Sequence, residues 1–267
     1  MTLAHRRSQR RRASVPSPGK ESRAQRRRRA LQIIERLHER YPDVRLPLKH
    51  RDPFQLLVAT ILSAQCTDAM VNRVTPVLFE KFRTPQDFAA ARPRDVERIV
   101  KPTGFFHQKT RAIVGMSRSL LERFGGRVPL TMDELLTLEG VGRKTANVLL
   151  SAKRLEPWGG GGDDPRDGLG LVVDTHVRRL SQRLGLATSD DPAKIERQLM
   201  EIIPREEWDG FSLRLIYFGR QVCTAQHPQC PTCPLNDLCP SAKYLGKPPW
   251  MKPRAAARAA AAIRSTR

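Results

Sequence analysis

Apolar side chains recur at every third or fourth position over most of the chain, which is the spacing of a helix with one buried face. The runs often begin next to Asp, Thr or Pro, which are typical of helix starts. The sequence shows neither convincing β-strand alternation nor an internal repeat, so it predicts a nearly all-α fold. The expected helices cover residues 27–40, 54–63, 68–82, 85–90, 93–100, 108–124, 133–138, 143–153, 192–203 and 208–221, with one more after Asp174.

Two of these helices, 133–138 and 143–153, are joined by a tight hairpin with Gly140 and Gly142 at its turn. At both glycines we expect a positive φ and a close backbone approach. The open N–H groups at the start of the second helix form an anion site, beside Arg143 and Lys144. A plain structural turn remains the alternative, because Gly-x-Gly turns are common.

Four of the five cysteines lie within seventeen residues, as Cys223-x6-Cys230-x2-Cys233-x5-Cys239. Four thiolates this close can surround one metal centre, and an all-thiolate set favours an iron–sulfur site. Zinc is the competing interpretation, although four-cysteine zinc sites usually show two Cys-x2-Cys pairs and this chain has one. Cys66 stands apart and is interpreted as a small buried hydrophobic residue.

Positive charge gathers at the two ends of the chain. Residues 1–30 carry a net charge of +10 and residues 241–267 carry +7, out of +21 overall. Such arms attract polyanions without selecting sequence, or serve only to keep the protein in solution. The chain contains no apolar run long enough for a membrane span and no apolar secretion signal. Its Arg- and Ser-rich start is also typical of an organelle transit peptide.

Several motifs together resemble one family. These are residues 138–146 with Lys144, residues 172–177 with Asp174, residues 63–68 with Gln65, and the cysteine spacing. They resemble endonuclease III, the iron–sulfur branch of the helix-hairpin-helix DNA glycosylases, over about residues 30–243. The resemblance implies a [4Fe–4S] cluster on the four cysteines. It also implies excision of oxidised pyrimidines, followed by strand cleavage on the 3′ side of the abasic site.

The resemblance further implies a six-helix barrel domain with the hairpin and a four-helix cluster domain, which flank a DNA-binding groove. The expected partner is double-stranded DNA with a damaged base or an abasic site. We expect a monomer in the cytoplasm, associated with the nucleoid and not with a membrane. The predicted parts are a disordered basic tail (1–28), the cluster domain (29–45 and 171–244), the barrel (46–155), a Gly-rich insertion (156–170) and a second basic tail (245–267).

By this resemblance Lys144 attacks the sugar C1′ and forms a Schiff base. Only a neutral amine is nucleophilic, and a place near the positive end of a helix dipole disfavours the ammonium form. Asp174 resembles the family's catalytic carboxylate, which deprotonates the nucleophile and stabilises positive charge on the sugar. Asp174 is also a natural helix N-cap, and the two roles are compatible.

The expected DNA contacts come from two further loops and the hairpin. Gln65 matches the residue that fills the gap left by a flipped base, with a plain polar loop residue as the alternative. Residues 104–107 match the loop that wedges into the opposite strand, with Phe105 and His107 as its contacts, although Phe105 also suits a protein core. Gly140, Gly142 and Arg143 are expected at the phosphates, and His176 is expected to help order the site.

Two departures from the family pattern stand out. Residues 224–229, between the first two cluster cysteines, contain no Lys or Arg, so this loop's contact with DNA is in doubt. Residues 156–170 make the connection before Asp174 roughly ten residues longer than usual.

Two other classes of protein are alternative interpretations of the sequence. Adenine glycosylases generally lack the hairpin lysine and carry an extra domain, and a non-catalytic helix-hairpin-helix protein would not need Lys144 and Asp174 together.

Overall fold

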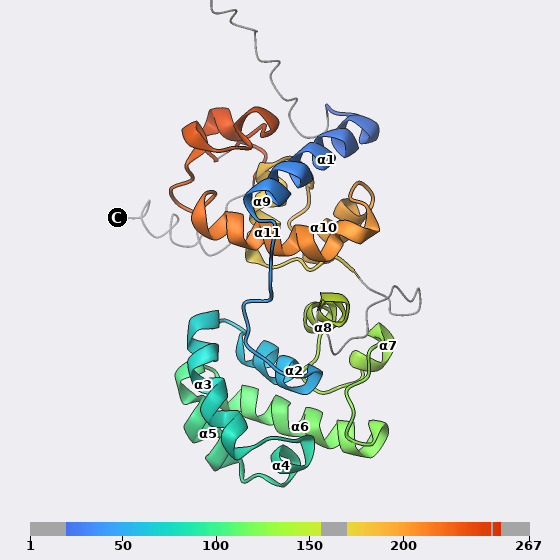
Figure 1. Cartoon of the computed structure of the whole chain (residues 1–267), viewed down its shortest axis with the longest axis vertical. Coiled ribbons are helices and arrows are strands. Elements are labelled where there is room, and N and C mark those ends of the chain that lie inside the picture. Colours follow the sequence, from blue (N-terminus) through green and yellow to red (C-terminus); the bar gives the residue numbers. More distant parts are fainter. Residues whose placement is uncertain (1–19, 156–169, 247, 252–267) are drawn as a thin grey trace, which may run out of the picture. The chain divides into compact units, whose positions relative to one another are not determined.

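The computed structural model describes residues 20–155, 170–246 and 248–251 of the 267-residue chain. Within these ranges all regular structure is helical, which confirms the all-α prediction (Figure 1). The chain divides into two compact units. The central unit comprises Asp43–Val172 and Trp208–Leu213, and the discontinuous unit comprises Met1–Pro42, Val173–Glu207 and Arg214–Arg267. No helix in the described ranges is long and apolar enough to span a membrane.

The core of the central unit forms around α2, whose side chains are almost all buried. Helices α3, α6 and α8 pack against α2, while α4 and α5 pack against α6 (Figure 1). The elements of this unit are α2 (Pro53–Leu62), α3 (Asp68–Lys81), α4 (Pro85–Ala90), α5 (Pro93–Val100), the 3₁₀ turn η1 (Lys101–Thr103), α6 (Phe106–Phe124), α7 (Met132–Leu135) and α8 (Arg143–Leu155).

Two helix starts in the central unit, those of α2 and α4, are set by a short polar side chain followed by proline. Asp52 precedes Pro53, and its Oδ1 accepts a hydrogen bond from the N–H of Gln55 at 2.8 Å. Thr84 precedes Pro85 and forms a reciprocal capping box with Asp87. These side chains satisfy N–H groups that have no partner inside the helix, which explains why the sequence locates these helices so closely.

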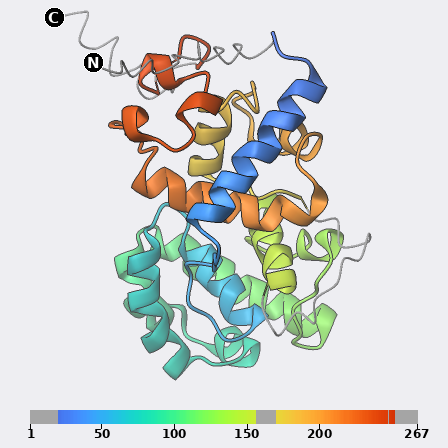
Figure 2. The same ribbon diagram turned by 45° about the horizontal axis from the view of Figure 1, so that its top comes forward.

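The discontinuous unit joins α1 to the end of α11 through one tyrosine. The carbonyl of Tyr41 accepts a hydrogen bond from Arg214 Nε at 3.0 Å, and its hydroxyl donates to Gln221 at 2.9 Å. In Figure 2, α1 accordingly ends against α11. The helices of this unit are α1 (Arg23–Arg40), α9 (Thr175–Arg183) and α10 (Pro192–Met200). The unit also contains the part of α11 (Trp208–Gln221) that begins at Arg214.

The predicted disordered tail over residues 1–28 is wrong at its end, because α1 begins at Arg23 and not at residue 27. Ser22 Oγ accepts a hydrogen bond from the N–H of Gln25, and the Ser22 N–H donates to Gln25 Oε1. Arg29 is buried and forms an ion pair with Glu21 at 2.6 Å. The arginine-rich composition of this stretch therefore suggested disorder, although Ser22 caps the start of α1 there. Residues 1–19 lie outside the described ranges.

The second predicted tail, 245–267, also begins too early. The indole of Trp250 donates to the carbonyl of Gln182 at 3.2 Å and lies edge-on to Tyr244 at 5.6 Å. The ordered fold therefore reaches Met251, because one aromatic side chain anchors a segment of low apolar content. Residues 247 and 252–267 lie outside the described ranges, as does the predicted insertion except for Gly170.

The hairpin between α7 and α8 packs closely on α6. Gly140 has φ +73°, and a Cβ atom placed on it would lie 2.6 Å from Ala112 Cβ. Gly142 does not have the expected positive φ, and a Cβ on it would meet no atom within 4 Å. The two glycines therefore serve different purposes. Gly140 permits the turn and its packing, while Gly142 leaves open space before α8.

This difference predicts opposite outcomes for two matched substitutions. Gly140→Ala combines an unfavourable positive φ with overpacking against α6, and should lower the free energy of unfolding by about 2–4 kcal/mol. Gly142→Ala adds a methyl group in open space at a helix start, and should cost less than about 1 kcal/mol. Urea unfolding of both variants measures the difference. Equal losses would contradict the packing described for Gly140.

Candidate active site and cysteine-lined cavity

The hairpin is held by two buried side chains and by hydrogen bonds within consecutive backbone turns. Leu138 and Val141 are buried, and their N–H groups donate to the carbonyls of Leu135 and Leu138 at 3.1 and 3.2 Å. The first predicted helix, 133–138, is shorter than expected, because α7 ends at Leu135 and the chain turns from there. Buried leucine and valine thus fix the hairpin from inside, while Gly142 faces open space.

Lys144 projects from the first turn of α8, on the side opposite the buried face. Ala146, Leu149 and Leu150 are buried, and α8 packs on α2. Lys144 itself is exposed, as is the neighbouring Arg143. The N–H groups of this first turn have no partner inside the helix and carry the positive end of its dipole. The predicted anion site is therefore physically available beside the exposed Lys144 side chain.

Asp174 is the N-cap of α9 and is half-buried. Its Oδ1 accepts hydrogen bonds from the N–H groups of His176 and Val177, both at 2.8 Å. Within the described part of the chain no partner is recorded for Oδ2, so one carboxylate oxygen caps the helix while the other stays available. The predicted cap is confirmed, and it fixes the carboxylate to a rigid helix end.

His176 is held in place from two sides. Its Nδ1 accepts a hydrogen bond from Arg179 Nη2 at 3.2 Å, and a Cβ on Gly219 would lie 2.8 Å from the same nitrogen. The imidazole therefore packs directly against the backbone of α11. This arrangement suits the ordering role expected for His176.

Two side chains that sequence reasoning missed hold the segment before Asp174. The amide oxygen of buried Asn147, on α8, accepts from the N–H of Gly170 at 3.2 Å. The hydroxyl of buried Ser212, on α11, donates to the carbonyl of Val172 at 3.0 Å. A polar residue on the apolar face of 143–153 was the only signal for Asn147. The role of Ser212 could not be predicted from the sequence, because it depends on the fold bringing α11 next to Val172.

Gln65 and Phe105 share an uncommon backbone conformation. Both have positive φ values, +51° and +49°, and both are exposed, Phe105 by 57%. Non-glycine residues in this region are strained, and such residues cluster at functional sites. The alternative in which Phe105 is a core residue is therefore wrong, because its ring lies in solvent.

The predicted wedge loop is shorter than residues 104–107, because α6 begins at Phe106 and Phe105 is its N-cap residue. His107 is therefore helical, and its Nδ1 lies 2.8 Å from Glu97 Oε1. One groove along α6 is lined by His107 and also by Glu139 of the hairpin. The central unit thus brings the wedge loop and the hairpin to a shared face of α6, whereas Asp174 and the cluster cysteines belong to the discontinuous unit.

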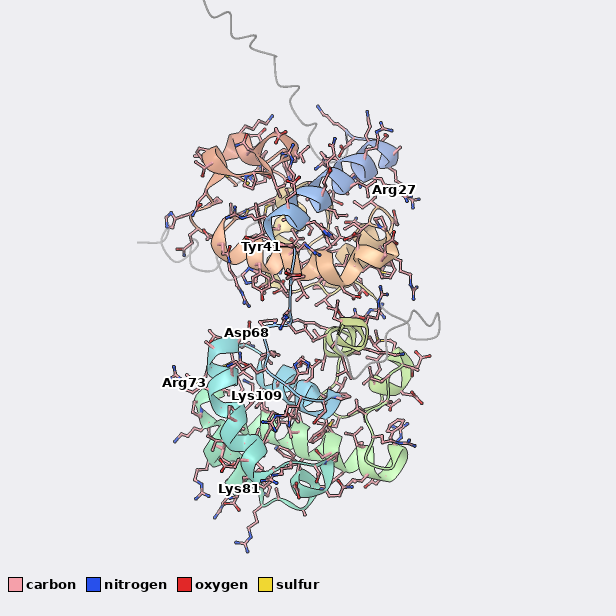
Figure 3. All side chains as sticks on the ribbon, in the orientation of Figure 1. Arg27, Tyr41, Asp68, Arg73, Lys81 and Lys109 are labelled. Atoms are coloured by element: carbon pink, nitrogen blue, oxygen red, sulfur yellow. The ribbon has the colours of Figure 1, made fainter. Side chains whose placement is uncertain are left out.

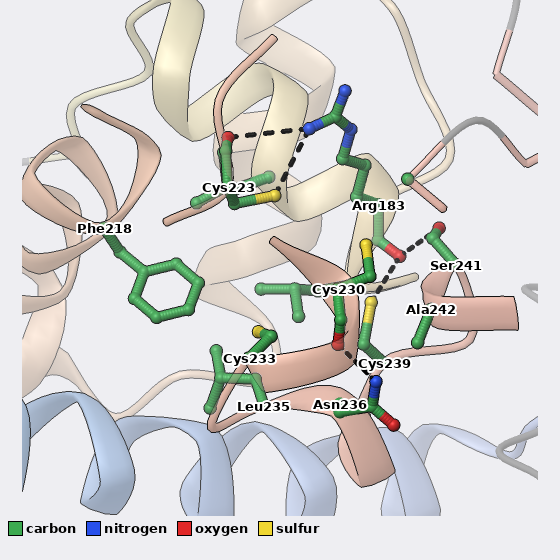
Figure 4. A pocket seen from close by; sticks show the side chains of 13 residues that line it. Arg183, Phe218, Cys223, Cys230, Cys233, Leu235, Asn236, Cys239, Ser241 and Ala242 are labelled. Carbon is green, nitrogen blue, oxygen red and sulfur yellow. Dashed lines mark hydrogen bonds between the residues drawn. The ribbon is translucent and has the colours of Figure 1, made fainter. Parts of the chain in front are cut away.

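The four clustered cysteines line a single cavity (Figure 4). Apolar side chains close it, with Phe218 and Leu235 among them. No three His, Cys, Asp or Glu side chains in the described ranges are grouped tightly enough to hold a single metal ion. Four thiols around one enclosed, apolar space are a donor set that fits an iron–sulfur cluster. Cys66, in contrast, is half-exposed and not the buried residue expected.

Burial favours the thiol form of Cys230, Cys233 and Cys239 when no metal is bound, because it raises the pKa of each. It raises the pKa of Cys239 to about 12 and the pKa of Cys233 to about 11. Ligation must therefore displace protons, because thiolate is the ligand. Arg183 is 4% exposed and supplies positive charge, since its Nη1 lies 3.3 Å from Cys223 Sγ (Figure 4).

The loop after Cys223 is held by Arg183, a buried cation on α9. Arg183 Nη1 donates to the carbonyl of Thr224 at 2.6 Å, and its Nη2 donates to the carbonyl of Ala225 at 2.7 Å. The guanidinium thus braces residues 224–229 from within the fold. Because the guanidinium donates to backbone carbonyls inside the fold, Arg183 does not replace the surface Lys or Arg expected in this loop from the family pattern.

Two family models match the chain. Residues 58–205 match the model described as HhH-GPD superfamily base excision DNA repair protein. Residues 223–239, which span the four clustered cysteines, match the iron–sulfur binding domain of endonuclease III. The first match covers the hairpin, Lys144 and Asp174, and the second covers the cysteine-lined cavity.

Whole-chain comparisons agree with these matches. The chain is 47% identical to endonuclease III of Synechocystis sp., over 82% of this chain and 95% of that protein. It is 41% identical to endonuclease III of Bacillus subtilis, over 77% and 89%. A structure of a trapped endonuclease III–DNA covalent intermediate matches with a TM-score of 0.74 and 42% identity, over 82% of this chain and 97% of that chain.

A more distant structure, a thermostable thymine-DNA glycosylase, shares the fold at 20% identity with a TM-score of 0.68, covering 84% of this chain and 100% of that chain. The near relatives match almost from end to end, and the two family models cover the hairpin and the cysteines. The chain therefore belongs to the endonuclease III family, within the helix-hairpin-helix superfamily of base-excision DNA repair proteins, and it carries that family's iron–sulfur binding domain.

Proposed function

We propose that this enzyme removes oxidised pyrimidines from duplex DNA and then cleaves the strand on the 3′ side of the abasic site, with Lys144 as nucleophile. The observation that carries the proposal is the exposed Lys144 in the first turn of α8, directly behind the open space at Gly142. The 42% identical structure is of a covalent endonuclease III–DNA intermediate, which supports a covalent mechanism here.

Duplex DNA docks through its backbone at the hairpin. A phosphate approaches Gly142, where no side chain intervenes, and accepts hydrogen bonds from N–H groups at the start of α8. Arg143 adds a guanidinium beside that phosphate. This contact carries no sequence information, as a repair enzyme that must scan any sequence requires. It also brings a sugar near Lys144.

Excision needs the damaged base outside the stack, because the sugar C1′ cannot be reached inside a duplex. Phe105 presents an exposed ring on a strained turn, which suits insertion between bases of the opposite strand. Gln65 presents an exposed amide on an equally strained turn, which suits filling the vacated space and hydrogen bonding the orphaned base. The backbone strain keeps both side chains presented before DNA arrives.

The neutral Nζ of Lys144 then forms a bond to C1′ while the bond from C1′ to the base breaks, and the base leaves with the electron pair. The sugar ring opens to give a protonated Schiff base. Loss of a proton from C2′ then expels the 3′ phosphate, and water releases the lysine. The iminium acts as the electron sink, so no redox partner is needed.

Asp174 supports these steps through its available oxygen. Oδ1 is committed to two N–H groups of α9, so the carboxylate cannot rotate freely. Oδ2 accepts the proton that Lys144 loses, and the negative charge stabilises the cationic sugar as the base departs. His176, packed on Gly219 and held by Arg179, keeps the start of α9 in register.

The four cysteines of the cavity would hold a [4Fe–4S] cluster. When bound, the cluster supplies four metal–thiolate bonds that cross-link residues 223–239. Cys223 and Cys239 then fix both ends of this segment. Arg183 offsets part of the negative charge near Cys223. The zinc alternative is decided by metal analysis.

The two competing functions predict different chemistry on damaged DNA. A monofunctional adenine glycosylase would excise a base without forming a Schiff base, and a non-catalytic binding protein would do neither. Lys144 at the hairpin favours the bifunctional enzyme over both. We further propose a monomer that acts in the cytoplasm at the nucleoid, where the basic ends of the chain strengthen binding to DNA in a salt-dependent manner.

The first prediction concerns the nucleophile. Lys144→Gln should abolish strand cleavage and borohydride trapping on duplex DNA with an oxidised pyrimidine, since an amide cannot form a Schiff base. DNA affinity should change by less than about tenfold, because the backbone N–H groups remain. Lys153→Gln removes the same charge from the last turn of α8 and serves as the control. Undiminished trapping by Lys144→Gln would assign the nucleophile elsewhere.

The second prediction separates chemistry from helix capping. Asp174→Asn keeps a side-chain oxygen for the two N–H groups, so the free energy of unfolding should change by less than about 1 kcal/mol. Single-turnover excision should fall by about 100-fold or more, because the carboxylate charge is lost. Asp191→Asn makes the same change at the N-cap of α10 and should leave excision intact. Near-normal excision by Asp174→Asn would leave this residue a structural role only.

The third prediction identifies the metal. Protein purified without oxygen should be brown and contain about four iron atoms and four sulfides per chain, without stoichiometric zinc. Cys239→Ser should lose most of the iron, because it removes one of the four thiols that line the cavity. Cys66→Ser should keep it, because Cys66 lies outside the cavity. Zinc in place of iron, measured by elemental analysis, would overturn the assignment.

A further inference from the structure

Lys109 is a buried lysine that none of the steps above uses. It lies in the first turns of α6, is 4% exposed, and points into the interior of the central unit (Figure 3). Burial lowers its pKa, and among the described residues no carboxylate offsets its charge. A buried cation without a counter-ion is costly, so its hydrogen bonds indicate what it holds.

Two hydrogen bonds that Lys109 donates hold the predicted wedge loop. Its Nζ donates to the carbonyl of Thr103 at 2.7 Å, and its N–H donates to the carbonyl of Phe105 at 3.0 Å. Between these two carbonyls lie Gly104 and Phe105, with φ values of +69° and +49°. One residue thus holds the loop on both sides of its left-handed turn.

The loop that carries Gln65 belongs to the same group of packed elements. The turn with Gln65 joins α2 to α3, α6 packs on α2, and η1, which ends at Thr103, packs on α3. After burial, the other influence on the pKa of Lys109 comes from Cys66, the residue that follows Gln65. The two strained turns, 40 residues apart in sequence, therefore belong to elements that pack on one another.

We propose that Lys109 is a positioning residue, whose buried ammonium fixes the Phe105 turn and the Gln65 turn together so that both side chains are presented to the duplex at once. This inference rests on the proposed function, in which these two side chains enter the DNA. A lysine that only stabilised the central unit would affect all activities alike. A positioning lysine affects the step in which a base must leave the stack.

Comparison of two DNA substrates tests this distinction. The damaged base must be unstacked before excision, whereas a preformed abasic site has no base to extrude. With Lys109→Met, single-turnover excision at saturating enzyme should fall by about 10- to 100-fold, as small misplacements do. Borohydride trapping on the abasic duplex should fall by no more than about threefold, because Lys144 is untouched. Amide hydrogen exchange should accelerate at residues 104–106 and 65–67, and not throughout the unit.

Ser117→Ala provides the matched control, because Ser117 is also buried on α6 and donates only to Ile113 of the same helix. It should leave the substrate comparison and both turns unchanged. If Lys109→Met does not fold, Lys109→Gln keeps one N–H donor for Thr103 and carries the same comparison. Equal losses on both substrates, faster exchange throughout the unit, or no change at all would overturn the inference. Failure of the wild-type protein to trap any DNA would instead overturn the proposed function.

Discussion

The close approach of Gly140 to Ala112 is the constraint on which the hairpin depends. Only a residue without Cβ can bring the turn this near α6 and adopt a positive φ at the same position. With Leu138 and Val141 buried beneath it, the hairpin cannot shift outward without exposing apolar surface. The start of α8 is therefore presented with open N–H groups and an exposed Lys144. Close packing on one glycine leaves the neighbouring glycine free for a phosphate.

The central unit has unfavourable conformations and a buried charge at and beneath the surface expected to contact DNA. Gln65 and Phe105 occupy a strained backbone region, and Lys109 is buried without a counter-ion. Each feature would be expensive in an ordinary core, and the well-packed α2 and its neighbours support them. The discontinuous unit is organised differently. Its cavity is lined by four thiols, and burial keeps those of Cys233 and Cys239 protonated until a metal displaces their protons.

Local chemistry made much of this structure predictable. Asp52, Thr84 and Asp174 are caps whose side chains act within three residues, so sequence alone located those helix starts, and cysteine spacing located the cavity. Long-range contacts were not predictable. The Trp250 anchor and the Ser212 contact each join positions at least 40 residues apart. The α1 start was missed because a local capping box lies inside an arginine-rich stretch.

The central claim is that the hairpin presents Lys144 to the sugar of a flipped nucleotide. Its most direct test is to reduce the wild-type complex on abasic DNA with borohydride, digest it, and locate the modified lysine by mass spectrometry. The account predicts that the sugar remnant is attached to Nζ of Lys144 in essentially all of the cross-linked protein. A remnant attached to any other amine, such as Lys109 or Lys153, would contradict it.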